Sequence, residues 1–201
     1  MATESPSHQS PPASDVISRE LAAARKAAPT VLVLMGVSGS GKSTIAQELQ
    51  RVLGWPFQEG DDLHPPANVE KMRAGTPLND EDRLPWLQAV ARWIDERLAA
   101  GEPGIITCSN LKRAYRDITI GHRRGVTLIY LKGDERLIHG RIADRTHRYM
   151  PPSLLHSQFN TLEEPGPDEH AIVVTVHRSI PETVTELLER LAARQASGDS
   201  V

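Results

Sequence analysis

The stretch that decides the fold is VLVLMGVSGSGKST, residues 31–44. Residues 31–35 are all apolar, as expected for a central parallel strand that is covered on both faces. The strand runs into a loop, 36–43, that satisfies the pattern G-x-x-x-x-G-K-[ST], and residues 42–54 continue with helical spacing. A glycine-rich loop at this junction lets backbone N–H groups converge on an anion at the helix N-terminus. The stretch therefore predicts a phosphate-binding loop (P-loop).

The loop assigns a role to its lysine and to the residues around it. Lys42 is expected to reach the β- and γ-phosphates of a nucleotide, and the Ser43 hydroxyl is expected to bind Mg²⁺. The remaining candidates for contact with the phosphates are Gly36, Ser38, Gly39, Ser40, Gly41 and Thr44. A strand precedes the loop and a helix follows it, as a nucleotide-binding loop requires. This context favours a site for ATP and Mg²⁺ over a Gly/Ser turn with an incidental lysine.

Beyond the loop, short apolar runs alternate with amphipathic helical patterns. Strands are predicted at 30–36, 56–60, 104–109, 126–133 and 171–177, and helices at 42–54, 67–75, 79–101, 111–121, 134–145, 151–162 and 181–195. Strands that alternate with helices predict the α/β class, with a doubly wound, five-stranded parallel sheet flanked by helices. Ligands of such sheets bind beyond the carboxyl ends of the strands.

Composition limits the class of protein. The chain has 201 residues and a net charge of −3, which fits one domain and argues against a general nucleic-acid partner. No apolar run approaches the ~20 residues of a membrane span. A single cysteine, Cys108, favours a buried side chain and a cytoplasmic setting. We expect a disordered or partly helical tail at 1–28, a single domain at 29–196 and a disordered end at 197–201.

Two adjacent carboxylates follow the second predicted strand, in the segment FQEGDDLH, 57–64. An aspartate at this strand end faces the γ-phosphate across the crevice, where it can accept a proton from an acceptor hydroxyl and help to hold Mg²⁺. Side chains of adjacent residues diverge in an extended chain, and we favour Asp61 for this role. Asp62 is equally well explained as a solvated turn residue. The arrangement suits a small kinase that phosphorylates an alcohol.

Several cations and one histidine are further candidates. Lys112 and Arg116 are four residues apart on a predicted helix, so one face would carry both over the crevice. Arg141 and Arg145 begin a polar, proline-broken segment, about 141–152, which has the composition of a mobile lid that closes on the phosphoryl group. Arg83 or Arg116 would hold the carboxylate of an anionic acceptor. His64 is interpreted equally well as a polyol ligand or as a packing residue.

Five stretches resemble the thermoresistant type of gluconate kinase, a relative of shikimate and nucleoside monophosphate kinases. They are LMGVSGSGKST (34–44), EGDDLHPPANVEKMRAGTPLNDEDRLPWL (59–87), CSNLKRAYRD (108–117), IYLKGD (129–134) and LLHSQFNTLEEP (154–165). The resemblance implies a nucleoside-monophosphate-kinase-like fold with a mobile lid, and transfer of a phosphoryl group from ATP to the 6-hydroxyl of D-gluconate with Mg²⁺. It also implies a homodimer, acceptor activation by Asp61, lid arginines Arg141 and Arg145, and gluconate contacts from among His64, Lys71, Arg83, Lys112, Arg116 and Gln158.

The chain departs from the family pattern at two places. Asn110 stands where the family commonly has alanine, which suggests a helix cap or a polar substrate contact. Residues 146–150 read THRYM, with the histidine one position early, so a lid role for His147 does not carry over. Two alternatives stay open: a kinase for another small sugar acid or polyol such as shikimate, and a non-catalytic nucleotide-binding regulatory module.

Overall fold

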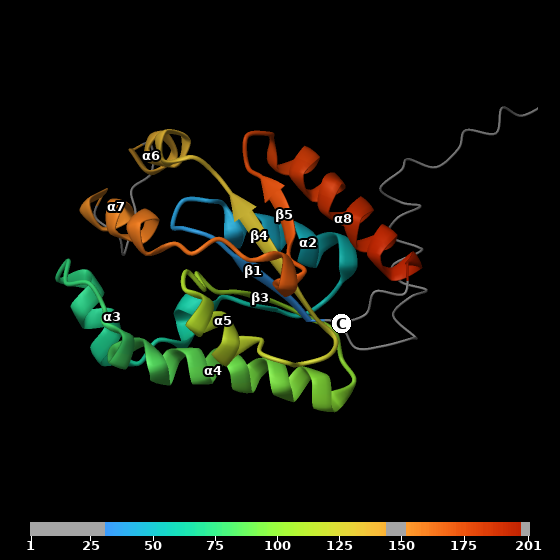
Figure 1. The fold of residues 1–201 in the computed structure, drawn as a ribbon, viewed down its shortest axis with the longest axis horizontal. Coiled ribbons are helices and arrows are strands. Elements are labelled where there is room, and N and C mark those ends of the chain that lie inside the picture. The colour runs from blue at the N-terminus through green and yellow to red at the C-terminus, as the bar shows by residue number, and fades with distance from the viewer. Residues whose placement is uncertain (1–30, 144–151, 198–201) are drawn as a thin grey trace, which may run out of the picture.

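The computed structural model describes residues 31–143 and 152–197, with the side chains of 142–143 and 152–154 left aside. Its five strands form a single sheet in which every neighbouring pair is parallel (Figure 1). In spatial order the strands are β2 (Phe57–Gln58), β3 (Gly104–Thr107), β1 (Val31–Met35), β4 (Val126–Lys132) and β5 (Ile172–Thr175). The five-stranded parallel α/β fold predicted from the sequence is confirmed.

Helices cover both faces of the sheet. They are α2 (Lys42–Leu53), α3 (Pro66–Arg73), α4 (Asp80–Ala100), α5 (Arg113–Thr119), α6 (Glu135–Ala143), α7 (Pro152–Thr161) and α8 (Ile180–Ala196), with 3₁₀ turns η1 (Gly60–Leu63) and η2 (Pro167–Glu169). Figure 1 shows α8 and α2 on one side of the sheet and α4 and α5 on the other. Helix α4 begins with a reciprocal capping box between Asn79 and Asp82 and ends at Gly101, close to the predicted limits.

The apolar run of β1 is explained by its place at the centre of the sheet. Leu32 and Leu34 pack into the cluster formed with α2 and α8, whereas Val31, Val33 and Met35 pack against α4 and α5. All five side chains are fully buried. Alternate residues thus supply two separate cores, which is why this strand has no polar face.

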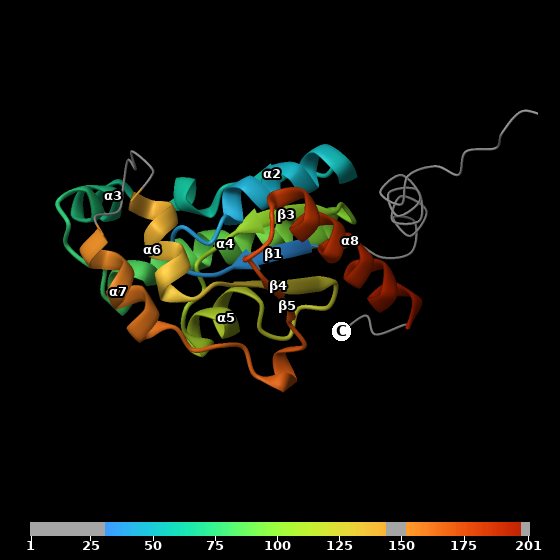
Figure 2. The same ribbon diagram turned by 90° about the horizontal axis from the view of Figure 1, so that it is seen from above.

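The carboxyl ends of the strands share one edge, where α3, α6 and α7 gather in both views (Figures 1 and 2). Two predicted elements are shorter than expected at this edge. The strand predicted at 56–60 keeps two residues before η1 begins, and α5 begins at Arg113 instead of residue 111. Both changes place irregular backbone where side chains can face a ligand.

Some sequence predictions fall outside the described residues. They include the tail at 1–28, most of the lid at 141–152 with Arg145 and residues 146–150, and residues 198–201. Within the described residues, no helix is both long enough and apolar enough to span a bilayer.

Candidate active site

A cavity of about 460 Å³ opens at the carboxyl edge of the sheet. Its walls come from the P-loop, from the segment after β2, from α3 and the start of α4, from the end of β3 and from α7. The lining residues are Ser38, Gly39, Gly41, Lys42, Ser43, Thr44, Glu59, Asp61, Asp62, His64, Val69, Met72, Thr76, Pro77, Leu78, Arg83, Trp86, Ser109, Ser157 and Gln158. The volume lies in the range typical of small-molecule sites.

The P-loop takes a conformation that requires glycine. Gly36 has φ +144°, and a Cβ there would lie 2.8 Å from the carbonyl oxygen of Leu131. The N-cap of α2 is Gly41, so no side chain caps the first N–H groups of the helix, and its first turn contains no acidic residue. These donors stay available to an anion, as the helix dipole also favours.

Lys42 folds back over the loop. Its Nζ donates to the backbone carbonyls of Gly36 and Val37, each at 3.0 Å. Burial lowers the pKa of the Lys42 ammonium, and the negative charge of Asp61 opposes that shift. The ammonium lies in the cavity wall beside the open helix N-terminus, which is where the phosphates of a nucleotide would bind.

Gly36 and Ser40 are the two predicted phosphate contacts that do not line the cavity. Ser40 is fully buried, and its Oγ has no hydrogen-bond partner among the described residues. Gly36 donates its N–H to the carbonyl of Ser109 at 3.3 Å and so ties the loop to the end of β3. Both residues therefore belong to the part of the P-loop that does not line the cavity.

Asp61 lies in the same cavity as Lys42, on the segment that follows β2. Burial in this cavity raises the pKa of the Asp61 carboxyl, and the positive charge of Lys42 opposes the shift. No ion pair joins the two side chains; the carboxylate lies among the cavity walls, while residue 61 as a whole is exposed at the cavity opening. Asp61 is thus placed to receive a proton from a ligand instead of neutralising the lysine. Asp62 lines the cavity as well and is exposed.

Gly60 sets the position of Asp61. Its N–H donates to Thr107 Oγ1 at 3.0 Å, and its carbonyl accepts from Trp86 Nε1 at 2.7 Å. A Cβ on Gly60 would lie 1.8 Å from the backbone oxygen of Thr107, closer than any real contact. The chain therefore turns into η1 against the end of β3 only because residue 60 has no side chain.

The Gly60→Ala variant is expected to lose roughly 10²-fold or more in kcat, because the backbone must move away from Thr107 and carry Asp61 with it. Steady-state kinetics on the variant, with its fold checked by circular dichroism, measures the effect. Gly101→Ala is the control for backbone strain away from the cavity, since its φ of +64° strains an alanine although a Cβ there meets nothing within 4 Å. A kcat within threefold of wild type would contradict the role of Gly60.

The predicted cationic ligands separate into two groups. Arg83 lines the cavity, half-buried, with its guanidinium carbon 5.8 Å from the centroid of the Tyr115 ring. Its guanidinium makes no ion pair within the described part of the chain. Lys71 and Lys112 do not line the cavity, and their ammonium groups pair with Asp82 at 2.6 Å and Asp80 at 2.8 Å. Of these three side chains, Arg83 is the one that lines the cavity.

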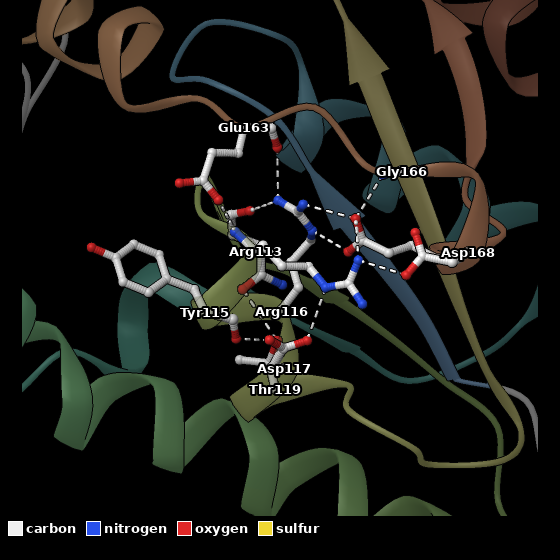
Figure 3. A network of polar contacts seen from close by, with 10 residues as sticks. Arg113, Tyr115, Arg116, Asp117, Thr119, Glu163, Gly166 and Asp168 are labelled. Atoms are coloured by element: carbon white, nitrogen blue, oxygen red, sulfur yellow. Dashed lines mark hydrogen bonds and ion pairs between the residues drawn. The ribbon is translucent and has the colours of Figure 1, made fainter.

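Arg116 is held in a polar network beside the cavity (Figure 3). Its guanidinium forms a bidentate ion pair with Glu169 and donates to the carbonyls of Asn110 and Glu163. Lys112, four residues earlier, is extended and precedes α5, so the two side chains do not share a helix face. Arg116 is buried and does not line the cavity, and protein acceptors occupy its donors, so the structure lends no support to the expectation that it contacts the substrate.

Asn110 also differs from its expected role. It adopts φ +47° and is fully buried, whereas the N-cap of α5 is Lys112. Its Oδ1 accepts from Thr119 Oγ1 at 3.2 Å and lies 3.3 Å from the Cys108 sulfur. Asn110 is therefore neither a helix cap nor a cavity residue. Cys108 itself is 1% exposed, and burial raises the pKa of its thiol to about 12.

Helices α6 and α7 carry the last predicted site residues. Gln158 lines the cavity, and its Oε1 accepts from the Ser38 backbone N–H at 2.7 Å, so α7 contacts the P-loop directly. Arg141 lies outside the cavity and donates to the carbonyl of Val176 at 2.5 Å. Arg145 is outside the described residues. The structure thus brings Gln158, but not Arg141, to the candidate site.

Sequence reasoning missed part of the cavity wall. Glu59 lines it and accepts from Thr107 Oγ1, and Ser109 follows β3 at the same edge. The rule that ligands bind at strand ends could have found both residues. Val69, Met72 and Leu78 form an apolar part of the wall. Their sequence pattern does not indicate a cavity, because apolar residues in such a segment predict a contact with the core equally well.

Fold and cavity together define a P-loop phosphotransferase: a parallel sheet, an open anion-binding loop and a carboxylate facing it. Comparison with known proteins agrees, since residues 31–165 match the family model described as AAA domain. The chain is 47% identical to a gluconokinase of Gluconobacter oxydans, over 81% of this chain and 90% of the relative. It is 42% identical to the thermoresistant gluconokinase of Escherichia coli, over 79% and 91% of the two chains. The chain belongs to the gluconokinase family.

A solved structure supports the same assignment. The crystal structure of a gluconokinase from Sinorhizobium meliloti superposes with a TM-score of 0.73 at 42% identity, covering 85% of this chain and 98% of the other. The resemblance inferred from the sequence motifs is confirmed at the level of the family and of the fold.

Proposed function

We propose that this chain transfers the γ-phosphoryl group of ATP to the 6-hydroxyl of D-gluconate, giving 6-phospho-D-gluconate and ADP. The observation that carries the proposal is that Lys42, Asp61 and Arg83 line one cavity. The three side chains belong to the P-loop, to η1 after β2 and to α4, and they match the three needs of the reaction. These needs are a cation for the phosphates, a base for the hydroxyl and a cation for the carboxylate.

Each side chain has a defined part in the reaction. The P-loop amides and Lys42 hold the phosphates in line with the acceptor, which supplies most of the catalysis in phosphoryl transfer. Asp61 accepts the proton of the 6-hydroxyl as that oxygen attacks the γ-phosphorus and the bond to the β-phosphate oxygen breaks. Arg83 holds the carboxylate at the other end of the sugar acid, and His64 and Gln158 line the cavity for its hydroxyls.

The residues also fit Mg²⁺. Ser43 and Asp61 both line the cavity and offer hard oxygen donors, to which phosphate oxygens and water would add the other ligands. No cluster of three or more His, Cys, Asp or Glu side chains suited to a metal occurs among the described residues, as expected for an ion held mainly by substrate. Bound Mg²⁺ would neutralise phosphate charge. We also propose that Arg141 and Arg145, the latter outside the described residues, contact the phosphates during transfer.

An ADP-release assay tests the function. Purified protein with ATP and Mg²⁺ is given gluconate, shikimate, glycerate or no acceptor, and ADP is followed by a coupled assay. We expect release that depends on gluconate. Release with shikimate or glycerate instead would favour the alternative of another sugar acid or polyol, and absence of release with ATP binding retained would favour the regulatory module.

The Arg83→Ala variant is expected to raise the KM for gluconate roughly 10- to 100-fold with little change in kcat, because a charge-assisted contact to the substrate carboxylate is lost in ground and transition states alike. The KM for ATP should not change. Arg92→Ala is the matched control, since Arg92 is an exposed arginine on the same helix. An unchanged KM for gluconate would remove Arg83 from the substrate site.

We further propose a homodimer, a cytoplasmic setting and one catalytic domain at 29–196 with a separate tail. The single cysteine, Cys108, supports the cytoplasmic setting because it is buried as a free thiol. Family resemblance supports the dimer, which light scattering at defined concentrations would test.

A further inference from the structure

His64 lies on the cavity wall in a fixed ring orientation. Its imidazole stacks on the indole of Trp86, with centroids 4.2 Å apart and planes 14° from parallel. Trp86 is itself held by its hydrogen bond to Gly60, the residue that positions Asp61. The ring is thus part of the same rigid assembly as the candidate base.

Asn68, on α3, lies behind this ring and is 4% exposed. Its Nδ2 lies 2.6 Å from the backbone carbonyl oxygen of Asp82. A carbonyl oxygen only accepts hydrogen bonds, so the amide group facing Asp82 must be the NH₂ end. This contact fixes the orientation of the Asn68 amide without reference to the histidine.

The same Nδ2 lies 3.4 Å from His64 Nδ1. Because Asn68 presents its NH₂ group there, Nδ1 has to be the acceptor, and the proton of the neutral imidazole sits on Nε2. Burial, together with the charge of Arg83, lowers the pKa of His64 to about 4, so the ring stays neutral near pH 7. Nε2–H is then a hydrogen-bond donor on a residue that lines the cavity, and no acceptor for it is present among the described residues.

We propose that Asn68 is a positioning residue that holds His64 in its Nε2–H tautomer, so that His64 donates to a hydroxyl oxygen of the bound sugar acid. The proposal rests on the proposed function for the identity of the ligand. In this arrangement His64 recognises a hydroxyl oxygen that accepts its hydrogen bond. A sugar acid that lacks this hydroxyl would leave the His64 Nε2–H unpaired in the complex.

Nitrogen-15 NMR of the histidine side chains in the full chain tests the tautomer without substrate. The His64 resonances are assigned by their loss in His64→Gln, and His122→Gln serves as the control because His122 is exposed and outside the cavity. We expect a bare Nδ1 and a protonated Nε2 in the wild type. A proton on Nδ1 of the neutral ring would overturn the proposal.

Variants at Asn68 test the cause. Asn68→Asp replaces the hydrogen-bond donor that faces His64 Nδ1 by an acceptor. We expect the imidazole proton to move to Nδ1. The KM for gluconate should then rise roughly three- to tenfold, and the KM for ATP should not change. Should its carboxylate, set against the Asp82 carbonyl, prevent folding, Asn68→Ala is expected to give a mixture of tautomers. A pure Nε2–H signal in the folded variant would overturn the role of Asn68.

Rescue separates recognition from packing. His64→Gln places an amide N–H near the position of Nε2 and is expected to keep the KM for gluconate within about threefold of wild type, whereas His64→Leu should raise it roughly three- to tenfold. Equal KM values for the two variants would contradict the donor role. Failure of the proposed function would show separately, as absence of gluconate-dependent ADP release from the wild type with the tautomer intact.

Discussion

The Asp61→Asn variant is expected to lose roughly 10²–10⁴-fold in kcat while binding ATP in the absence of Mg²⁺ as tightly as the wild type. Asparagine keeps the size of the side chain but cannot accept the proton of the attacking hydroxyl. Steady-state kinetics with gluconate gives kcat, and calorimetric titration with ATP gives the affinity. Asp95→Asn is the charge-matched control, because Asp95 pairs with Arg123 at the exposed surface of α4. A loss below threefold would make Asp61 a bystander.

The pH profile provides a second signature of the same residue. Burial raises the pKa of Asp61, and only its deprotonated form can act as the base. The activity is therefore expected to fall on the acid side at a pH above the ordinary range of an aspartate. This acid limb of kcat/KM should be absent from Asp61→Asn. A wild-type limb that persists in the variant would assign it to another group.

The Arg116→Ala variant is expected to lower the free energy of unfolding by about 3–5 kcal/mol, because it removes the bidentate ion-pair partner of the buried Glu169 carboxylate. Arg116 is 2% exposed and the Glu169 side chain 9%. Burial alone would raise the pKa of Glu169, but the hydrogen bonds from Arg116 and from the Gly166 N–H, together with the charges of the two nearby arginines, outweigh it and lower that pKa. The contribution of the pair is thus present near pH 7 and lost as pH falls through the lowered pKa. Denaturant unfolding measures the change.

Two variants show whether the loss comes from the buried charge. Arg113→Ala removes a neighbouring arginine whose closest partners, Asp117 and Asp168, are mostly exposed, and which contacts Glu169 only at 3.6 Å. It should therefore destabilise the protein much less than Arg116→Ala. Combining Arg116→Met with Glu169→Met removes both charges and should recover part of the stability lost in Arg116→Ala. If Arg116→Ala unfolds like the wild type, or if Arg113→Ala costs as much, the network in Figure 3 does not hold α5 to the segment before β5.

The order of residues along the chain is enough to predict the strands and helices and to place the P-loop and Asp61 at one edge of the sheet. The run at 31–35 is buried on both faces, and the P-loop follows at a strand end, because each signal is contained in a few consecutive residues. Asp61 could be predicted for a related reason. The ends of parallel strands share an edge, so a carboxylate after β2 is expected at the same edge of the sheet as the P-loop.

Only the tertiary structure decided what the other polar side chains do. The sequence around an arginine does not show which carboxylate it will bind. Arg83 is proposed to bind a substrate carboxylate, whereas Arg116 binds the carboxylate of Glu169, which is 53 residues away in the chain. The need for glycine at position 60 and the orientation of Asn68 likewise come from Thr107 and Asp82. These partners are distant in sequence, and a local pattern specifies neither which groups meet nor which nitrogen of a ring keeps its proton.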